Sequence, residues 1–283
     1  MIHTIPLLEE TVHGFFSNAL EPVLTVNPAD SVRFQSLNAG WRWIPDAEHF
    51  ARDAELHNGH ALTGPIAVRG ARAGQTLVVG IDEITPGDWG VTFGDGELFK
   101  WTHDGDAWRL DDATVEPAPF LGVIGMPPPE PGIHSTGPPR RFGGNIDCKL
   151  LVAGTTLFLP IPVDGALLSL GDGHGAQGDG EVSGTAIECP VESAKVTLEL
   201  TDLELRMPIA RTEDSWVTFG FDQDLDTAVV LAVETMLDLM ERNLGVTRNR
   251  ALALASVVVD VHVTQVVNGA KGAHAILRDG AIR

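Results

Sequence analysis

The stretch of sequence that decides the fold is KVTLELT, residues 195–201, in which polar and apolar side chains alternate. On an extended strand Val196, Leu198 and Leu200 point to one face, and the polar residues between them point to the other. A strand with one apolar face has to bury that face against a second layer of structure. The alternation therefore predicts a layered β structure around these residues.

Glycine and proline divide the chain around this strand into short apolar runs. The 283 residues include 31 glycines and 18 prolines, and short strands separated by turns of these residues are typical of sandwiches and barrels. Residues 76–84 and 155–163 are further strand candidates, although Pro160 and Pro162 favour a sheet edge or a bulge for the second. Prolines also exclude a helix from residues 126–141, which we expect to form a stiff extended loop.

Late in the chain the pattern changes from strand to helix. Apolar residues recur three and four positions apart from Leu225 to Met240, which predicts an amphipathic helix that Gly245 can end. Thr247 is placed to cap a second, shorter helix over residues 248–256. This part of the chain therefore differs from the β-rich part that precedes it.

The last segment returns to strand chemistry. Residues 257–267 are rich in β-branched side chains and lead to a turn at Asn268 and Gly269. We therefore expect a mainly β fold, a jelly-roll-like sandwich or barrel over residues 1–221, with a small α+β element over residues 222–283 that packs on the same body.

Acidic residues outnumber basic ones by 39 to 19, which gives a formal net charge of −20. Such a charge repels phosphate groups, so we expect neither nucleic acid nor a membrane surface as a partner. No basic and then apolar leader opens the chain, and no run reaches the ~18 apolar residues of a membrane span. The expected setting is cytoplasmic and the expected ligand a small molecule. The edges of a mainly β chain favour a homo-oligomer such as a dimer.

The densest group of polar residues is GDGHGAQGDGE, residues 171–181. Its glycines allow positive φ and a close approach of the backbone to a ligand. A solvated turn would have a similar composition, but this loop lies between two structured stretches and places one histidine among three carboxylates. Borderline divalent cations such as zinc accept imidazole nitrogen together with carboxylate oxygen. Calcium is the alternative ion, although the EF-hand pattern is absent.

A second polar group lies upstream, in GGNIDCK, residues 143–149. Asn145 and Asp147 are two positions apart, so on an extended segment they point to the same face. Asp260 and His262 share a strand face in the same way, which we interpret as a structural pair rather than a second metal site. The expected site therefore combines residues 143–149 with the glycine-rich loop.

Three segments of the chain are similar to those of a known family. Residues 143–188, GGNIDCKLLVAGTTLFLPIPVDGALLSLGDGHGAQGDGEVSGTAIE, resemble the hallmark segment of the acetamidase/formamidase family, and residues 62–79, LTGPIAVRGARAGQTLVV, resemble its first conserved block. Residues 134–144, HSTGPPRRFGG, are similar to the loop before the hallmark segment in one branch of the family. The resemblance implies a jelly-roll type of β fold, hydrolysis of short aliphatic amides such as formamide or acetamide to a carboxylate and ammonia, and a divalent metal in the site.

The resemblance also implies which residues form the site. The matching polar positions are Asn145, Asp147, His174, Gln177, Asp179, Glu181 and Glu188. We assign the metal, zinc by preference, to Asp147, His174 and Glu188. His60 is a further candidate ligand, although it matches only one branch of the family. Gly175 departs from the alanine expected after His174.

The remaining polar residues have expected roles in converting the substrate. Glu181 or Asp179, outside the metal shell, would take a proton from water and give it to the leaving nitrogen. Asn145 and Gln177 would hydrogen-bond the amide group, and His134 would contact the substrate from the proline-bounded loop. These roles are those of a metal-dependent amidohydrolase.

Two other functions fit the same residues. A site of this kind could hydrolyse another small C–N compound, such as urea, a carbamate or a hydroxy-amide, because family likeness indicates reaction type better than substrate. A jelly-roll protein could also bind a small ligand without turning it over. Ammonia release, measured before and after chelation, separates these functions.

Overall fold

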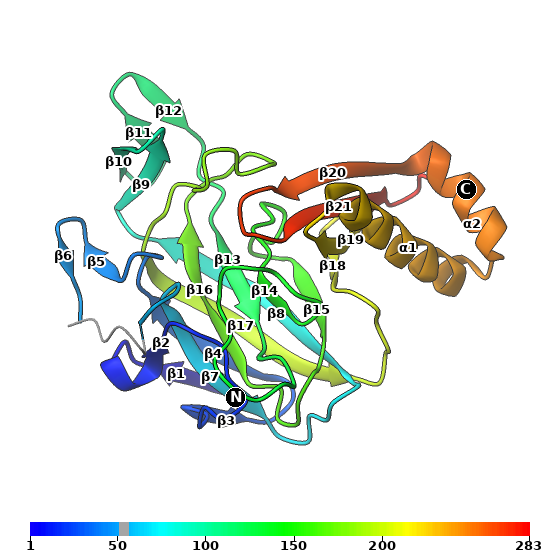
Figure 1. Ribbon diagram of the computed structural model, residues 1–283, viewed down its shortest axis with the longest axis horizontal. Coiled ribbons are helices and arrows are strands. Elements are labelled where there is room, and N and C mark those ends of the chain that lie inside the picture. The colour runs from blue at the N-terminus through cyan, green and yellow to red at the C-terminus, as the bar shows by residue number, and fades with distance from the viewer. Residues whose placement is uncertain (51–56) are drawn as a thin grey trace.

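The computed structural model describes residues 1–50 and 57–283, and within these residues the largest element is a nine-stranded sheet (Figure 1). In order across the sheet, its strands are β1 (Ile2–Ile5), β4 (Asp30–Ser36), β17 (Val191–Thr201), β8 (Thr76–Pro86), β15 (Thr156–Pro160), β18 (Ile209–Arg211), β19 (Ser215–Asp222), β21 (Lys271–Arg278) and β20 (Val259–Gln265). Only the β1–β4 pair of this described sheet is parallel. The sheet runs through both expected parts of the chain, because β18 and β19 join the body to β21 and β20.

A second sheet, of six strands in the described part of the chain, faces the first. Its strands are β14 (Gly143–Asn145), β13 (Phe120–Gly125), β16 (Leu168–His174), β7 (Leu62–Val68) and β2 (Val12–His13), with β3 (Leu24–Val26) also paired to β7. Two smaller sheets project at the left of Figure 1. They are β12 (Ala113–Val115), β11 (Trp108–Leu110), β10 (Glu97–His103) and β9 (Trp89–Gly94), and the hairpin of β5 (Arg42–Ile44) and β6 (Ala47–Glu48). A short 3-10 turn, η1 (Glu9–Thr11), precedes β2.

β17 contains the strand predicted from the alternating pattern, and it lies between β4 and β8. Val196 and Leu198 are 0% exposed, and Leu200 packs against the same core. This core also contains Leu121 and Leu170 from the six-stranded sheet, so the two sheets enclose one apolar interior. Burying a side chain of this size contributes about 1.5–3 kcal/mol to folding. The prediction of a mainly β, layered fold is confirmed.

The structure corrects the position predicted for residues 155–163. β15 is an interior strand that pairs with β8 along its whole length and with β18 through Thr156, Leu157 and Phe158. Pro160 lies at the end of β15, beyond the pairing with β18, where its missing N–H removes no bond to that strand. The edge prediction is wrong because the covering strand comes from a distant part of the chain.

The structure also corrects the extent of the glycine-rich loop. Residues 171–174 continue β16 instead of beginning a loop, so Asp172 and His174 lie on a strand. Gly175 follows directly, and a Cβ at that position would lie 2.3 Å from the Trp108 ring. Glycine, in place of the alanine expected at this position, therefore leaves room for the Trp108 ring.

The helix α1 (Leu225–Leu244) begins and ends at its caps. Asp224 Oδ1 accepts a hydrogen bond from Thr227 N at 2.9 Å, and Gly245 adopts a left-handed φ of 64° that ends the helix as predicted. The apolar face of α1 packs on β19 and β21. Gly220 of β19 permits this close approach, because a Cβ there would lie 2.0 Å from Ala228 O.

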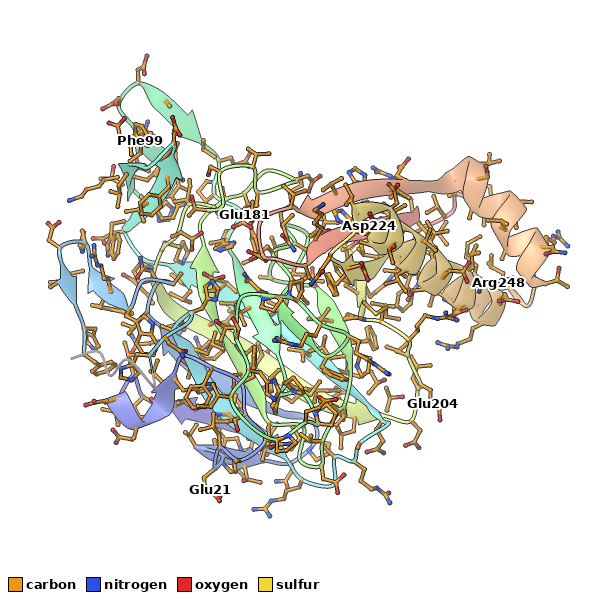
Figure 2. The ribbon with its side chains drawn as sticks, in the orientation of Figure 1. Glu21, Phe99, Glu181, Glu204, Asp224 and Arg248 are labelled. Carbon is orange, nitrogen blue, oxygen red and sulfur yellow. The ribbon has the colours of Figure 1, made fainter. Side chains whose placement is uncertain are left out.

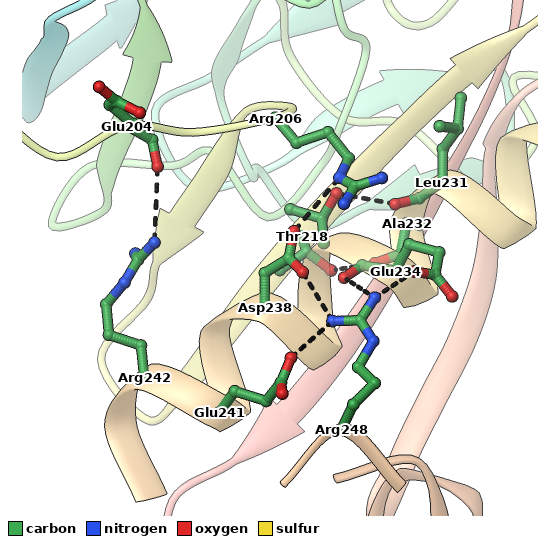
Figure 3. Close-up of polar contacts among 11 residues, drawn as sticks. Glu204, Arg206, Thr218, Leu231, Ala232, Glu234, Asp238, Glu241, Arg242 and Arg248 are labelled. Carbon is green, nitrogen blue, oxygen red and sulfur yellow. Dashed lines mark hydrogen bonds and ion pairs between the residues drawn. The ribbon is translucent and has the colours of Figure 1, made fainter. Parts of the chain in front are cut away.

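The helix α2 (Arg248–Val258) is capped by Thr247, whose side chain accepts a hydrogen bond from Arg250 N, as the sequence predicted. It runs two residues beyond the expected end, so the following strand begins at Val259 rather than residue 257. Arg248 joins the two helices by donating from Nη1 to Asp238 Oδ1 at 2.6 Å and to Glu241 Oε2 at 3.0 Å (Figure 3). No helix in the described part of the chain is long and apolar enough to cross a membrane.

Candidate metal centre

Within the described residues, five buried ionisable side chains meet at the end of β16. They are Asp147, Asp172, His174, Glu181 and Glu188, and each residue is at most 7% exposed. β16 supplies Asp172 and His174, Asp147 follows β14 by two residues, and both glutamates come from the segment between β16 and β17. Three separate pieces of the chain therefore build one polar group inside an apolar body.

The imidazole of His174 lies at the centre of this group. Its Nε2 is 3.5 Å from Asp172 Oδ1 and 3.4 Å from Glu188 Oε1, and its Nδ1 is 3.9 Å from Asp147 Oδ1. Two sets of three ligand atoms share this histidine, one with Asp172 and Glu188, the other with Asp147 and Glu181, and within each set the atoms lie within 4.8 Å of one another. Both sets combine nitrogen and oxygen donors at a spacing that a metal ion can bridge.

The backbone here adopts a conformation that few residues other than glycine tolerate. Asp147, Asp172 and Glu181 have positive φ angles of 51°, 61° and 46°. The left-handed region costs about 1 kcal/mol or more for such residues, and strain of this kind is concentrated at functional sites. Gly122 of β13 leaves room for them, because a Cβ there would lie 2.5 Å from both Asp147 Oδ1 and Asp172 Oδ2. The left-handed backbone and the space at Gly122 together allow these carboxylates to point toward His174.

Several polar atoms of the group are buried without a hydrogen-bond partner among the described residues. They are Oδ1 of Asn145, Asp147 and Asp172, Oε2 of Glu181 and Glu188, and Nδ1 of His174. A buried polar atom left unpaired costs about 1–3 kcal/mol, and more if it is charged. A bound cation would satisfy carboxylate oxygens and an imidazole nitrogen together. The residues present therefore fit a divalent metal with mixed nitrogen and oxygen ligands.

Burial and the neighbouring charges shift the pKa values of these groups. Burial raises the pKa of Asp147 well above its ordinary value, and the neighbouring Glu181 raises it further. Burial likewise raises the pKa of Glu188, and it raises the pKa of Glu181 to about 7. Burial acts to lower the pKa of His174, but Glu188 and Asp172 beside the ring raise it overall. A bound cation would favour the ionised forms of Asp147, Glu181 and Glu188, which burial disfavours.

A cavity of about 360 Å³ adjoins this group. The polar residues that line it include His60, Asn145, Asp172, Glu181, Glu188 and Asn268. Burial acts to raise the pKa of Asp172, but the nearby His174 and His60 lower it overall. Figure 2 shows Glu181 between the end of β16 and the tip of the β20–β21 hairpin, where the C-terminal element meets the body.

Asn268 reaches the site from the turn between β20 and β21. Its Nδ2 donates a hydrogen bond to Asp147 Oδ2, although the two residues are 121 positions apart in sequence. Gln265, which is 0% exposed, fixes the turn by accepting a hydrogen bond from Asn268 N at 3.1 Å. Gly180 N also donates to Thr264 O at 3.0 Å, which ties β20 to the glycine-rich loop. The sequence predicts this turn but not its contact with Asp147, because nothing in the neighbouring residues indicates a partner so far away in the chain.

The structure brings most of the predicted site residues together. Five of them meet in the buried group or at its edge: Asn145, Asp147, His174, Glu181 and Glu188. His60 lines the cavity, and its Nδ1 is 2.8 Å from Thr136 Oγ1. Gln177 donates from Nε2 to the main-chain oxygen of Asp147 at 2.8 Å, so the contact we observe is to the chain and not to the cavity.

Two predicted residues lie elsewhere. Asp179 belongs to a different group, with its Oδ2 3.1 Å from Lys149 Nζ and 3.3 Å from His262 Nδ1. The expected pair of His262 with Asp260 is replaced by this contact. His134 lies outside the set of described residues that line the cavity.

Asp172 is a candidate ligand that the sequence pattern did not indicate. It stands two positions before His174, and because β16 continues through both residues, their side chains share one face of the strand. The alternation of glycine with other residues in LSLGDGH is the signal of this shared face. The glycines favoured a loop instead.

A model of the Acetamidase/Formamidase family matches residues 4–113 and 132–276. The chain belongs to this family. A formamidase from Methylophilus methylotrophus is 24% identical over 242 residues, which cover 61% of this chain and 60% of that protein. The chain therefore matches less than two thirds of the length of this curated relative.

Solved structures of the family share the fold over nearly the whole chain. The acetamidase from Bacillus halodurans has a TM-score of 0.87 at 28% identity and covers 97% of both chains. A predicted acetamidase/formamidase from Thermoanaerobacter tengcongensis has a TM-score of 0.88 at 27% identity, covering 99% of this chain and 96% of its own. The family resemblance read from the sequence is confirmed.

Proposed function

We propose that the protein is a metal-dependent amidase that hydrolyses an aliphatic amide, such as formamide or acetamide, to a carboxylate and ammonia. The observation that carries this proposal is the group of unpaired buried donors around His174, beside a cavity, in a chain of the Acetamidase/Formamidase family. Unpaired buried acids of this kind weaken a fold, so we attribute them to a function and not to stability.

We assign the metal to Asp172, His174 and Glu188, which form one of the two sets, and Asp147, beside the other nitrogen of the ring, is a further candidate ligand. Zinc is preferred over calcium because one donor is an imidazole nitrogen. When bound, such a cation supplies Lewis-acid chemistry, which polarises a carbonyl group and makes water acidic enough to attack near neutral pH. Gln177 supports this set by holding the main chain at Asp147.

Glu181 is the residue that we assign to proton transfer. Its pKa, raised by burial to about 7, suits a group that accepts and returns a proton near neutral pH. It would take the proton of the attacking water as the new C–O bond forms, and give a proton to nitrogen as the C–N bond breaks and ammonia leaves. Asp179 is a weaker candidate because it is paired with Lys149 and His262.

Asn145 and His60 are the residues that we assign to substrate orientation. Asn145 Oδ1 is buried and unpaired at the cavity, so it can accept a hydrogen bond from the amide nitrogen of a substrate. His60 lines the same cavity, and its ring is oriented by Thr136. Holding the amide in one orientation lowers the entropic cost of reaching the transition state.

Ammonia release from formamide, acetamide and urea tests this function, with metal content measured on the same sample before and after chelation. We expect ammonia from the amides, loss of activity with loss of metal, and recovery with zinc. His174→Ala should remove both bound metal and turnover, whereas His134→Ala, outside the described cavity lining, should keep both. A metal-loaded protein that releases no ammonia would instead be a binding protein, and activity that survives complete metal removal would contradict metal dependence.

A homodimeric assembly and a cytoplasmic setting stay predictions. Light scattering tests the first, and cell fractionation tests the second. Neither is needed for the chemistry proposed above, since every residue named in it belongs to one chain.

A further inference from the structure

The cavity beside the metal centre has two unlike ends. One end carries the carboxylates, and the other is an apolar wall of Trp89, Val91, Phe93 and Leu98. Phe93 is 41% exposed and Leu98 is 38% exposed, although both are large hydrophobic residues. Exposed apolar surface gathered in a concave site usually marks the place where a ligand is bound.

The wall is one continuous face of the β9–β10 hairpin. Trp89, Val91 and Phe93 occupy alternate positions of β9 and so point to the same side. Leu98 of β10 is directly opposite Phe93 in the antiparallel register, which places it on that side as well. The four side chains therefore present a single apolar surface to the cavity.

The opposite face of the hairpin is packed on the body. At Gly90 a Cβ would lie 2.5 Å from Ile187 Cγ2 and 3.2 Å from the Trp108 ring, so the hairpin rests closely on these residues. Phe99 lies on the same side as Gly90, and it is outside the set of described residues that line the cavity (Figure 2). The wall is therefore supported from behind rather than free to collapse into the cavity.

The wall begins at the candidate ligand Glu188 and leads away from it. Val91 N donates to Glu188 O at 3.0 Å, and Glu188 N donates to Val91 O at 2.8 Å. Phe93 lies two residues further along β9, roughly 7 Å away at the rise of an extended strand. Its main-chain N donates to Thr185 Oγ1 at 3.0 Å, which fixes the far part of the wall to the segment that carries Glu188.

The other side of the cavity is formed by Asn38, Ala39, Gly40 and Arg42, and it is fastened to the wall. Trp89 Nε1 donates to Trp43 O at 2.9 Å, and Lys100 Nζ is 2.8 Å from Asp46 Oδ1. The two projecting hairpins therefore enclose a slot that is apolar on one side.

We infer, on the basis of the proposed function, that the preferred substrates are primary amides with an apolar acyl group of about four to six carbons, which extends roughly 7 Å along this wall. The cavity of about 360 Å³ lies in the range of small-molecule pockets, and formamide would leave most of it to water. The acids at the metal centre disfavour an anionic tail, whereas an alkyl chain covers Val91, Phe93 and Leu98 and removes their surface from water.

Ammonia release from acetamide, butyramide and hexanamide tests this inference in the metal-loaded enzyme. Each buried methylene should raise kcat/KM by about fourfold, up to the length of the wall. Phe93→Ala should lower the ratio of kcat/KM for hexanamide to that for acetamide by about 10-fold. Phe99→Ala is the matched control, the same substitution on the other face of the same hairpin, and it should leave that ratio at the wild-type value.

Clear turnover of acetamide with a flat or falling series toward hexanamide would overturn the inference and leave the amidase function intact. An equal fall of the ratio in Phe93→Ala and Phe99→Ala would also overturn it, because the hairpin would then act only through its fold. A Phe93→Ala protein whose ratio is unchanged but whose oligomer dissociates would show that a second copy, not a substrate, covers the wall. Absence of ammonia from every amide would refute the proposed function itself.

Discussion

Replacing Gly122 by alanine places a methyl group inside the candidate metal centre. Its Cβ would lie 2.5 Å from Asp147 Oδ1, 2.5 Å from Asp172 Oδ2 and 2.8 Å from His174 Cε1. Carbon and oxygen atoms in ordinary contact are about 3.5 Å apart, so the two carboxylates must move by about 1 Å. Metal ligands tolerate only about 0.2 Å of such movement. We therefore expect Gly122→Ala to lose bound metal.

The size of the effect follows from the same displacement. A misplacement of about 1 Å in a catalytic site lowers turnover by about 100-fold, and overpacking of a dense site costs about 1–3 kcal/mol of stability. The backbone of Gly122 is not left-handed, so the loss would come from the added methyl group and not from backbone strain. The measurements are metal content, ammonia release and the free energy of unfolding on one preparation.

Gly178→Ala is the matched control for this substitution. Gly178 belongs to the glycine-rich loop, its φ is not positive, and its added Cβ would have no heavy atom within 4 Å. This variant should keep the metal and the activity of the wild type. A Gly122→Ala protein that also keeps both would refute the reasoning, because the carboxylates could not then form the centre described above.

Two further substitutions test the roles of buried ionisable groups. Glu181→Gln keeps the shape of the side chain but cannot carry the proton, so kcat should fall by about 100-fold or more while metal content stays at the wild-type level; loss of metal would instead make Glu181 a ligand. Burial lowers the pKa of His13 to about 4, so between pH 6.5 and pH 4 the unfolded chain binds more protons at this residue than the folded chain does. The contribution of His13 to the free energy of unfolding should be fully present above pH 6.5 and should fall by about 3 kcal/mol toward pH 4. Denaturant unfolding of wild type and His13→Gln at both pH values checks this, and an unchanged pH slope in the variant would contradict it.

Local features of the fold could be predicted from the sequence because they depend on neighbouring residues. The alternation in residues 195–201 predicted a half-buried strand, and Gly245 and Thr247 predicted a helix end and a helix start. Strand alternation and helix caps act over a few residues, so the chain carries this information in a short stretch. The interior position of β15 could not be predicted in this way, because it depends on a strand, β18, from elsewhere in the chain.

The sequence by itself determined the family, the mainly β architecture and the ligand candidates Asp147, His174 and Glu188, because their motif lies within one segment of chain. The tertiary structure decided how these and the neighbouring residues are used. It placed Asp172 beside His174, paired Asp179 with Lys149, and brought in Asn268 from a remote turn. The physical reason is that a metal centre depends on distances of a few ångströms, which are set by the pairing of strands that lie far apart in the sequence.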